Sequence, residues 1–324
     1  MTETHFVTGG AGFIGSNLVD RLLDCGRKVV VYDNFSTGRK VFLKRALSNP
    51  NFLLWEDDLL DLDAVTRTMS TAPIDMVWHL AANADVRFGL DHPRKDLEQN
   101  TIVTHNVLEA MRANNIQKIA FSSTGSVYGE PSLHPTPEDA PFPIQTSLYG
   151  ASKLACEALI QAYCEGFGFV GYIFRFVSAL GERYTHGHVF DFCRKLLDNP
   201  DELHILGDGR QRKSYMYVHD CIDAMLLAVE KCYNKASVFN LGVDGYVEVN
   251  DSMRVITERM GVRPKLTYAG GERGWVGDSP FIWLDVARIR SLGWKPNVSI
   301  LDGVIKTLDW LLENKWVFAN DCHE

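Results

Sequence analysis

A glycine-rich turn near the start of the chain limits what this sequence can fold into more than any other stretch does. It spans residues 7–16, with the sequence VTGGAGFIGS, between a short apolar run and an amphipathic stretch. Gly9 can make the tight turn out of a strand, Gly12 lets the backbone approach a pyrophosphate, and Gly15 lets the next helix pack closely. A helix starting near Gly12 would turn its free N–H groups and positive dipole end toward the phosphates. The turn therefore predicts a dinucleotide-binding site.

The segments on both sides of the turn fit this interpretation. Residues 5–7 and 28–32 predict two parallel strands, and the stretch between them has a helical apolar face made of Phe13, Ile14, Leu18, Leu22 and Leu23. The second strand ends in Asp33, whose carboxylate can accept hydrogen bonds from both ribose hydroxyls of an adenosine. Because Asp33 would repel a 2′-phosphate, we expect NAD rather than NADP, even though Arg39 lies nearby.

Strand and helix patterns then alternate along the first half of the chain. Strands are expected at residues 52–55, 75–80, 118–121 and 169–174, and helices at residues 41–47, 61–69, 93–113 and 147–163. This alternation is typical of an α/β fold with a doubly wound parallel sheet, covered by helices on both faces.

Beyond Arg175 the alternation breaks into loops. Short helices are expected at residues 189–197 and 220–230, a strand returning to the main sheet at residues 238–240, and a final amphipathic helix at residues 301–313. We therefore expect a dinucleotide-binding domain over residues 1–176 with a returning segment near 214–243. A smaller mixed α/β substrate-binding domain would comprise residues 177–213 and 244–324.

Charge and cysteine content exclude several classes of protein. The formal net charge is −8 and no run of Lys or Arg is present, which argues against nucleic acid or an anionic membrane as partner. The first strand follows Met1 directly and no apolar run approaches membrane-spanning length, so we expect a cytoplasmic protein. The 7 cysteines are scattered without metal-site spacing, which indicates reduced thiols and neither zinc nor a disulfide framework.

Tyr149 and Lys153 are the clearest candidates for chemistry. They are four residues apart on a predicted helix, hence on one face. An ammonium beside the phenol, together with a positively charged nicotinamide ring, favours the phenolate, so Tyr149 can act as a base. Thr124 ends the preceding predicted strand, where ligands lie in open parallel sheets, and its hydroxyl can bind the same substrate oxygen.

The chain resembles the extended short-chain dehydrogenase/reductase family and, within it, the nucleotide-sugar epimerases and dehydratases. The resemblance covers nearly the whole chain. It is carried by residues 8–15, 32–34, 79–82, 122–129, 149–153, 207–211 and 217–220, and by Asn100. It implies a Rossmann sheet that binds NAD.

The resemblance also implies the cofactor contacts. The glycine turn and Asp33 would hold the cofactor, Asp58 and Leu59 would lie near the adenine, Ala81 and Ala82 beside the pyrophosphate or nicotinamide ribose, and Lys153 would hold that ribose. The full expected set is Gly9, Gly12, Phe13, Ile14, Gly15, Asp33, Asn34, Asp58, Leu59, Ala81, Ala82, Asn100, Ser122, Tyr149 and Lys153. His79 is expected to be a core histidine rather than a catalyst.

The residues after Thr124 bear on the reaction. In the 4,6-dehydratases of the family an acidic pair follows the Ser/Thr, whereas here Gly125 and Ser126 follow it. Without those carboxylates, the natural cycle is oxidation at C4 of the sugar and reduction of the same carbon, which is epimerisation.

The substrate side implied by the resemblance comprises Thr124, Ser178, Arg183, Arg212, Lys213, Arg273 and Asp278. Ser178 stands where many members have Asn, and Lys213 where Arg is usual. Residues 273–278 look like the matching stretch of archaeal-type UDP-glucose 4-epimerases. With Thr124, Tyr149, Lys153 and no acidic pair, interconversion of UDP-glucose and UDP-galactose is expected. A hydroxyl residue at position 178 also fits a UDP-glucuronate 4-epimerase.

Three further interpretations remain. A nucleotide-sugar 4-keto reductase or a dehydratase would share the fold, and a non-enzymatic NAD-binding protein is disfavoured because Thr124, Tyr149 and Lys153 are all present. The resemblance also implies a homodimer, in which the helices at residues 93–113 and 147–163 pair with their copies as a four-helix bundle.

Overall fold

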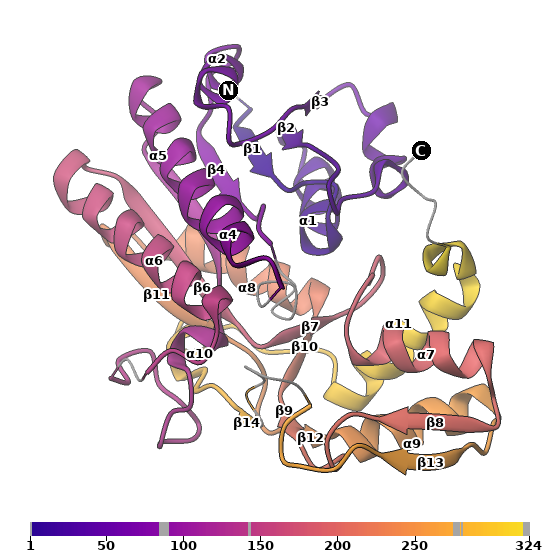
Figure 1. Ribbon diagram of the computed structural model, residues 1–324. Coiled ribbons are helices and arrows are strands. Elements are labelled where there is room, and N and C mark those ends of the chain that lie inside the picture. Colours follow the sequence, from indigo (N-terminus) through magenta and orange to yellow (C-terminus); the bar gives the residue numbers. More distant parts are fainter. Residues whose placement is uncertain (1, 84–90, 142–143, 275–278, 280, 320–324) are drawn as a thin grey trace.

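A seven-stranded parallel sheet forms the centre of the protein (Figure 1). The structure is a computed structural model that describes residues 2–83, 91–141, 144–274, 279 and 281–319. The strand order is β11-β6-β5-β4-β1-β2-β3, and each neighbouring pair is parallel. The strands are β1 (Thr4–Thr8), β2 (Lys28–Asp33), β3 (Phe52–Glu56), β4 (Met76–His79), β5 (Lys118–Thr124), β6 (Val170–Phe176) and β11 (Ala236–Leu241). The predicted fold class is confirmed, including the strand that returns from the second half of the chain.

Helices cover both faces of this sheet. One face carries α1 (Phe13–Asp24) and α8 (Val218–Lys231), and the other carries α2 (Leu62–Met69), α5 (Val103–Ala113) and α6 (Leu148–Phe167). Side chains alternate along each strand, so that in β1 Phe6 joins one apolar core and Val7 the other. Burial on both faces explains why the strands are continuously apolar in sequence.

Two predicted helices differ in detail from the structure. Residues 93–113 form a helix in three parts, α4 (Pro93–Asp96), the π-helical segment η3 (Leu97–Ile102) and α5. Residues 41–47 contain two short 3₁₀ helices, η1 (Lys40–Leu43) and η2 (Ala46–Ser48), in place of one helix. Short 3₁₀ pieces are common connectors, and π-helical segments often accompany functional positions.

The second half of the chain adds a smaller lobe with its own apolar core (Figure 1). Its main elements are α7 (His188–Asp198), β8 (Glu202–Ile205), α9 (Val249–Met260), β13 (Lys265–Tyr268), α11 (Ile300–Glu313) and η5 (Lys315–Phe318). Short strands connect it to the sheet, namely β7 (Ser178–Leu180), β9 (Arg212–Lys213), β10 (Tyr215–Tyr217), β12 (Val247–Glu248) and β14 (Phe281–Ile282). The turn η4 (Gly125–Tyr128) follows β5, and α10 (Ala287–Ser291) lies near β11.

Within the described residues, none of the helices combines the length and apolarity needed to cross a membrane. The predicted domain boundaries remain a prediction.

A buried ion pair ties the sheet to α6. Arg175 on β6 donates to Glu157 on α6 through Nη2 at 2.7 Å and through Nε at 3.0 Å. Its Nη1 donates to the hydroxyl of Tyr128 at 2.7 Å. Ser123, next to the end of β5, donates its hydroxyl to the same Glu157 carboxylate. Because both charges are fully buried, each depends on the other for its solvation.

We expect Arg175→Met to lower the free energy of unfolding by about 3–5 kcal/mol, because the Glu157 carboxylate would remain buried without its partner. Urea denaturation followed by circular dichroism measures this change. Lys235→Met is the matched control, since it breaks an exposed pair with Glu165 at 3.1 Å and should cost less than about 1 kcal/mol. Equal losses in the two variants would contradict a structural role for the buried pair.

Candidate active site

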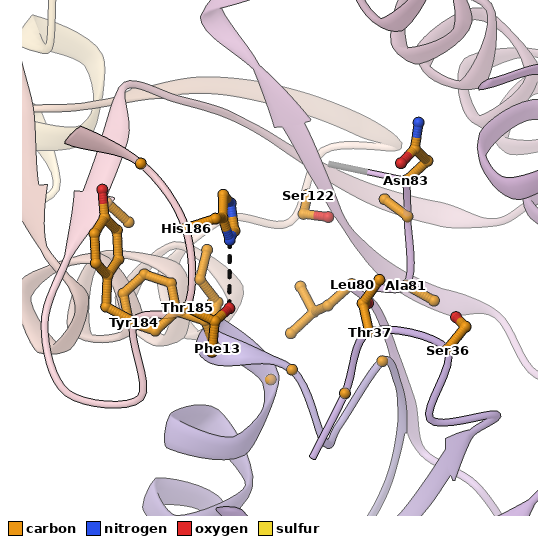
Figure 2. A pocket seen from close by; sticks show the side chains of 18 of the residues that line it. Phe13, Ser36, Thr37, Leu80, Ala81, Asn83, Ser122, Tyr184, Thr185 and His186 are labelled. Carbon is orange, nitrogen blue, oxygen red and sulfur yellow. Dashed lines mark hydrogen bonds between the residues drawn. The ribbon is translucent and has the colours of Figure 1, made fainter. Parts of the chain in front are cut away.

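A cavity of about 780 Å³ lies at the carboxyl ends of the parallel strands. The glycine turn after β1 and the ends of β2, β4 and β5 form one side of it, and residues 184–187 of the smaller lobe form the other. Figure 2 shows Tyr184, Thr185 and His186 opposite Thr37, Leu80 and Ser122. This edge of an open parallel sheet is where ligands bind.

The glycine turn has the close contacts that its sequence predicts. Gly9 has a φ of +68°, and a Cβ there would lie 2.6 Å from the backbone nitrogen of Ala81. A Cβ on Gly15 would lie 2.1 Å from the carbonyl oxygen of Gly9. Only glycine fits either position, because the backbones of β1, α1 and the segment after β4 approach one another so closely.

The start of α1 is open to an anion. Gly12 is the N-cap residue of this helix and has no side chain with which to cap it, and its first turn contains no acidic residue. Gly12, Phe13 and Ile14 all line the cavity. Helix N-termini bind phosphates through free N–H groups and the helix dipole, so this position fits a pyrophosphate.

Asp33 ends β2 and is fixed by the backbone. Its Oδ2 accepts from the N–H of Ala11 at 2.8 Å, and its Oδ1 accepts from the N–H of Phe35 at 2.9 Å. Burial raises the pKa of this carboxyl, whereas the two backbone hydrogen bonds lower it. Each carboxylate oxygen retains a further lone pair, so Asp33 can still accept from ribose hydroxyls.

Asp58 is the second acidic residue that the sequence places at the cofactor, near the adenine. Asp58 accepts from Asn34 Nδ2 at 3.0 Å and from the N–H of Leu60 at 2.9 Å. The predicted cofactor residues that line the cavity are Gly9, Gly12, Phe13, Ile14, Gly15, Asp33, Asn34, Asp58, Leu59, Ala81, Ala82, Ser122 and Tyr149. Glycine positions that no Cβ fits, an uncapped helix start and an anchored carboxylate together fit a dinucleotide.

Asn100 lies behind the cavity wall rather than in it. Its Oδ1 accepts from the N–H of Asn83 at 2.9 Å, and its Nδ2 donates to Ser152 Oγ at 2.9 Å. Asn83 lines the cavity and Ser152 precedes Lys153 on α6. The structure therefore supports a positioning role for Asn100, from inside the π-helical segment η3.

His79 is a core residue, as the sequence predicts. Its Nδ1 lies 2.7 Å from Thr8 Oγ1 and its Nε2 lies 2.9 Å from Thr104 Oγ1. Thr104 donates its hydroxyl to the carbonyl of Asn100, so this hydrogen-bond pattern assigns the proton of a neutral ring to Nε2. Burial lowers the pKa of His79 to about 3, so the ring is neutral at physiological pH.

Thr124 and Tyr149 line the cavity, whereas Lys153 is buried outside the lining. Ser147 caps the start of α6, its hydroxyl accepting from the N–H of Gly150 at 3.0 Å, and this places Tyr149 in the first turn. Lys153 is buried one turn later and donates Nζ to the carbonyl of Ser122 at 2.8 Å. The predicted helical face is thus turned toward the end of β5.

Burial shifts the pKa values of Tyr149 and Lys153 in the directions that disfavour their charged forms. It raises the pKa of Tyr149 to about 12, although a hydrogen bond with the Thr124 side chain opposes the rise. It lowers the pKa of Lys153 to about 8, against the attraction of Cys156, Glu157 and Asp96. Strongly perturbed titratable groups in a cavity are typical of catalytic sites.

The predicted substrate residues divide between the cavity and its surroundings. Thr124 and Ser178 line the cavity. Lys213 donates Nζ to the carbonyl of Ser279, and Arg273 pairs with Glu130.

The remaining predicted residues lie in other surroundings. Arg212 lies over the rings of Tyr246 and Phe281, at 5.6 and 5.1 Å. Arg183 pairs with Asp20 on α1. Asp278 lies outside the described residues. Contacts with a substrate therefore remain predictions for Lys213 and Arg273 as well as for Arg212, Arg183 and Asp278.

Sequence reasoning missed part of the wall. Thr185 and His186 come from a loop that the sequence marks only as rich in Gly and His, and their side chains lie within 3.4 Å of each other. Phe190 and residues 317–319 also line the cavity. Their apolar spacing indicates helix packing, and no local signal separates a cavity residue from a core residue.

These features define a dinucleotide-dependent enzyme with a Tyr/Lys site of the extended short-chain dehydrogenase/reductase type. A model of the NAD dependent epimerase/dehydratase family matches residues 5–242. The chain belongs to this family, which confirms the resemblance drawn from the sequence and NAD as the cofactor.

Individual relatives match along nearly their whole length. The chain is 34% identical over 314 residues to the putative UDP-glucose 4-epimerase of Methanocaldococcus jannaschii, which covers 95% of this chain and 98% of that protein. A crystal structure of UDP-glucose 4-epimerase with UDP-glucose from Thermotoga maritima gives a TM-score of 0.87 at 34% identity, covering 96% of this chain and 99% of that one. A crystal structure of UDP-glucuronic acid 4-epimerase from Bacillus cereus, in complex with UDP-glucuronic acid and NAD, gives a TM-score of 0.87 at 28% identity. It covers 96% of this chain and 99% of that one.

We expect Gly15→Ala to weaken NAD binding about ten-fold or more, because its methyl group would push α1 away from the glycine turn. Isothermal titration with NAD measures the affinity. Gly166→Ala on α6 is the matched control, since a Cβ there meets no atom within 4 Å and should leave binding unchanged. An unchanged affinity in Gly15→Ala would contradict the packing argument.

Proposed function

We propose that the protein is an NAD-dependent nucleotide-sugar 4-epimerase that interconverts UDP-glucose and UDP-galactose. The observation that carries the proposal is that Thr124 and Tyr149 line the cavity together, with Gly125 and Ser126 where an acidic pair would follow. Lys153 is buried one helical turn after Tyr149, against the carbonyl of Ser122 at the end of β5. These residues supply a base and an oxygen-binding hydroxyl.

The protein side chains handle the proton of the sugar's C4 hydroxyl. The Thr124 hydroxyl binds the C4 oxygen, and the Tyr149 oxygen takes the hydroxyl proton during oxidation and returns it during reduction. Lys153, four residues later, carries the positive charge that favours the phenolate. NAD, when bound, supplies a reversible hydride acceptor. Because C4 is both oxidised and reduced, the reaction has no net redox change.

The acidic residues of the cavity favour epimerisation over dehydration. Among the described lining residues the carboxylates are Asp33, Asp57 and Asp58, which lie at the ends of β2 and β3. Elimination of water needs an acid and a base near the sugar. The lining that contains Tyr149 also includes the hydroxyl residues Ser122, Ser126 and Ser178.

The cations favour a neutral sugar over a glucuronate. The arginines in the described lining are Arg39 and Arg194. Arg39 donates to the carbonyl of Val317, and Arg194 lies 5.7 Å from the ring of Phe190, which contacts Phe318. Both therefore lie near the C-terminal segment, and none of the contacts described for them is with Thr124, Tyr149 or Ser178. UDP-glucuronate remains the alternative substrate, favoured by the hydroxyl at Ser178.

We expect purified protein to convert UDP-glucose to UDP-galactose, with UDP-glucuronate converted much more slowly. Anion-exchange or ion-pair chromatography of the products measures both reactions. Tyr149→Phe should lower the rate at least about 10²-fold while NAD binding is retained, because only the ionisable oxygen is lost.

The same assay separates the competing functions. Loss of NADH absorbance with a 4-keto sugar would indicate a reductase, and a 4-keto-6-deoxy product from UDP-glucose would indicate a dehydratase. If neither UDP-glucose nor UDP-glucuronate yields a C4 epimer, the proposal is wrong. Full activity in Tyr149→Phe would overturn the assignment of the base.

A homodimer through the helices at residues 93–113 and 147–163 is part of the proposal. On α6 the exposed residues Ala155, Ala158 and Ala162 are small enough for close helix approach. Leu97 and Ile102 on η3 are exposed as well, whereas Val107, Leu108 and Met111 of α5 are buried within the subunit core. The apolar surface left for a second copy is therefore smaller than the sequence alone indicates.

We expect light scattering coupled to size-exclusion chromatography to give the mass of a dimer. Ala158→Arg should shift the mass to that of a monomer, because a two-fold interface would bring the two introduced charges together. Leu133→Arg changes an exposed residue away from these helices and serves as the control. A wild-type monomer at high protein concentration would refute the dimer.

A further inference from the structure

We propose that the C-terminal segment Lys315–Phe318 with Ala319, held by Arg39, is a clasp over the cofactor cavity that retains NAD. The inference rests on NAD binding in this cavity and does not depend on which sugar is the substrate. It assigns cofactor retention to residues more than 270 positions apart in the sequence.

The segment forms part of the cavity itself. Val317, Phe318 and Ala319 line it together with Arg39 and Asp33. Asp33 marks the ribose end of the site, so the segment lies on the adenosine side. The ring of Phe318 packs against Phe190 of α7, with 4.8 Å between the ring centroids, which holds the segment to the rest of the smaller lobe.

Arg39 connects the segment to the glycine turn. Its backbone N–H donates to the carbonyl of Ala11 at 2.9 Å, which fixes its position beside the turn. Its Nη1 donates to the carbonyl of Val317 at 3.0 Å, and its guanidinium lies 5.9 Å from the ring centre of Trp316. One side chain thus links both sides of the cavity by a charge-assisted hydrogen bond and a cation–π contact.

Aromatic packing adds to the contacts that Arg39 makes with the C-terminal segment. Phe42 of η1 lies 6.3 Å from Trp310 on α11 and 6.0 Å from Trp316 on η5, measured between ring centroids. Val317 is buried in the core of the smaller lobe. The clasp is therefore anchored to the smaller lobe and contacts the sheet lobe through Arg39 and Phe42.

This arrangement predicts a specific effect on the cofactor. NAD bound along β1 and β2 would have the clasp beside its adenosine half. Its release would require the contacts of Arg39 with Val317 and Trp316 to separate, while the packing of Phe318 on Phe190 keeps the segment in place. An enzyme that returns its hydride in each turnover has no need to exchange its cofactor, so slow release is compatible with catalysis.

The test measures NADH release from two clasp variants, Arg39→Leu and Phe318→Ala. Protein loaded with NADH is mixed with excess NAD in a stopped-flow instrument, and the decay of NADH fluorescence gives the dissociation rate. We expect each variant to release NADH about ten-fold faster, which corresponds to the loss of one charge-assisted hydrogen bond or one buried ring contact.

The matched control is Lys315→Ala, which changes an exposed residue of the same segment that does not line the cavity. It should release NADH at the wild-type rate. Arg39→Lys keeps the positive charge and should restore part of the retention. If Phe318→Ala does not fold, as judged by its melting temperature, the Arg39 variants decide.

Release rates within two-fold of wild type in both Arg39→Leu and a folded Phe318→Ala would overturn the clasp. This outcome is distinguishable from failure of the proposed function, because NADH release is measured without a sugar nucleotide. A protein that retains NADH slowly through Arg39 but epimerises no UDP-sugar would support the clasp and contradict the proposed substrate.

Discussion

A chain of buried hydrogen bonds joins β1, which leads into the glycine turn, to helix α6, which carries Tyr149 and Lys153. It runs from Thr8 at the end of β1 through His79 and Thr104 to Asn100, whose side-chain amide donates to Ser152 on α6. The Thr8 hydroxyl also accepts from the backbone after β4. A neutral, fully bonded histidine at its centre costs no buried charge. The network keeps the glycine turn and the Tyr/Lys helix in a fixed relation, and catalysis requires that relation to be exact to a fraction of an ångström.

The ion pair of Glu157 and Arg175 is a second connection between α6 and the sheet. Glu157 lies one helical turn beyond Lys153, and it accepts from Ser123, the neighbour of Thr124. Buried pairs bring little net stability, since desolvation offsets their attraction. Their directional hydrogen bonds do favour a single geometry, and here that geometry fixes the end of β5 against α6.

The sequence predicts well those features that local chemistry determines. The parallel strands follow from continuous apolar runs, and the glycine turn from the close approach that Gly9 and Gly15 permit. The Tyr149 and Lys153 face follows from helical spacing. The sequence does not predict the π-helical segment around Asn100, because it depends on partners 17 and 52 residues away. The sequence also does not predict that the C-terminal segment lines the cavity or that Arg212 lies over aromatic rings. Both are tertiary contacts that leave no local pattern in the sequence.

The perturbed pKa values of Tyr149 and Lys153 follow from their shared position. Burial alone opposes both ions, since it raises the pKa of the phenol to about 12 and lowers that of the ammonium to about 8. A positive charge near a phenolate lowers the cost of forming it, so the cationic nicotinamide ring of a bound NAD would bring the pKa of Tyr149 down. The pKa of Tyr149 is thus set first by burial and then by the groups around it. A base with this dependence is reactive mainly when positive charge is next to it, which couples proton transfer to the oxidation of a substrate in the same cavity.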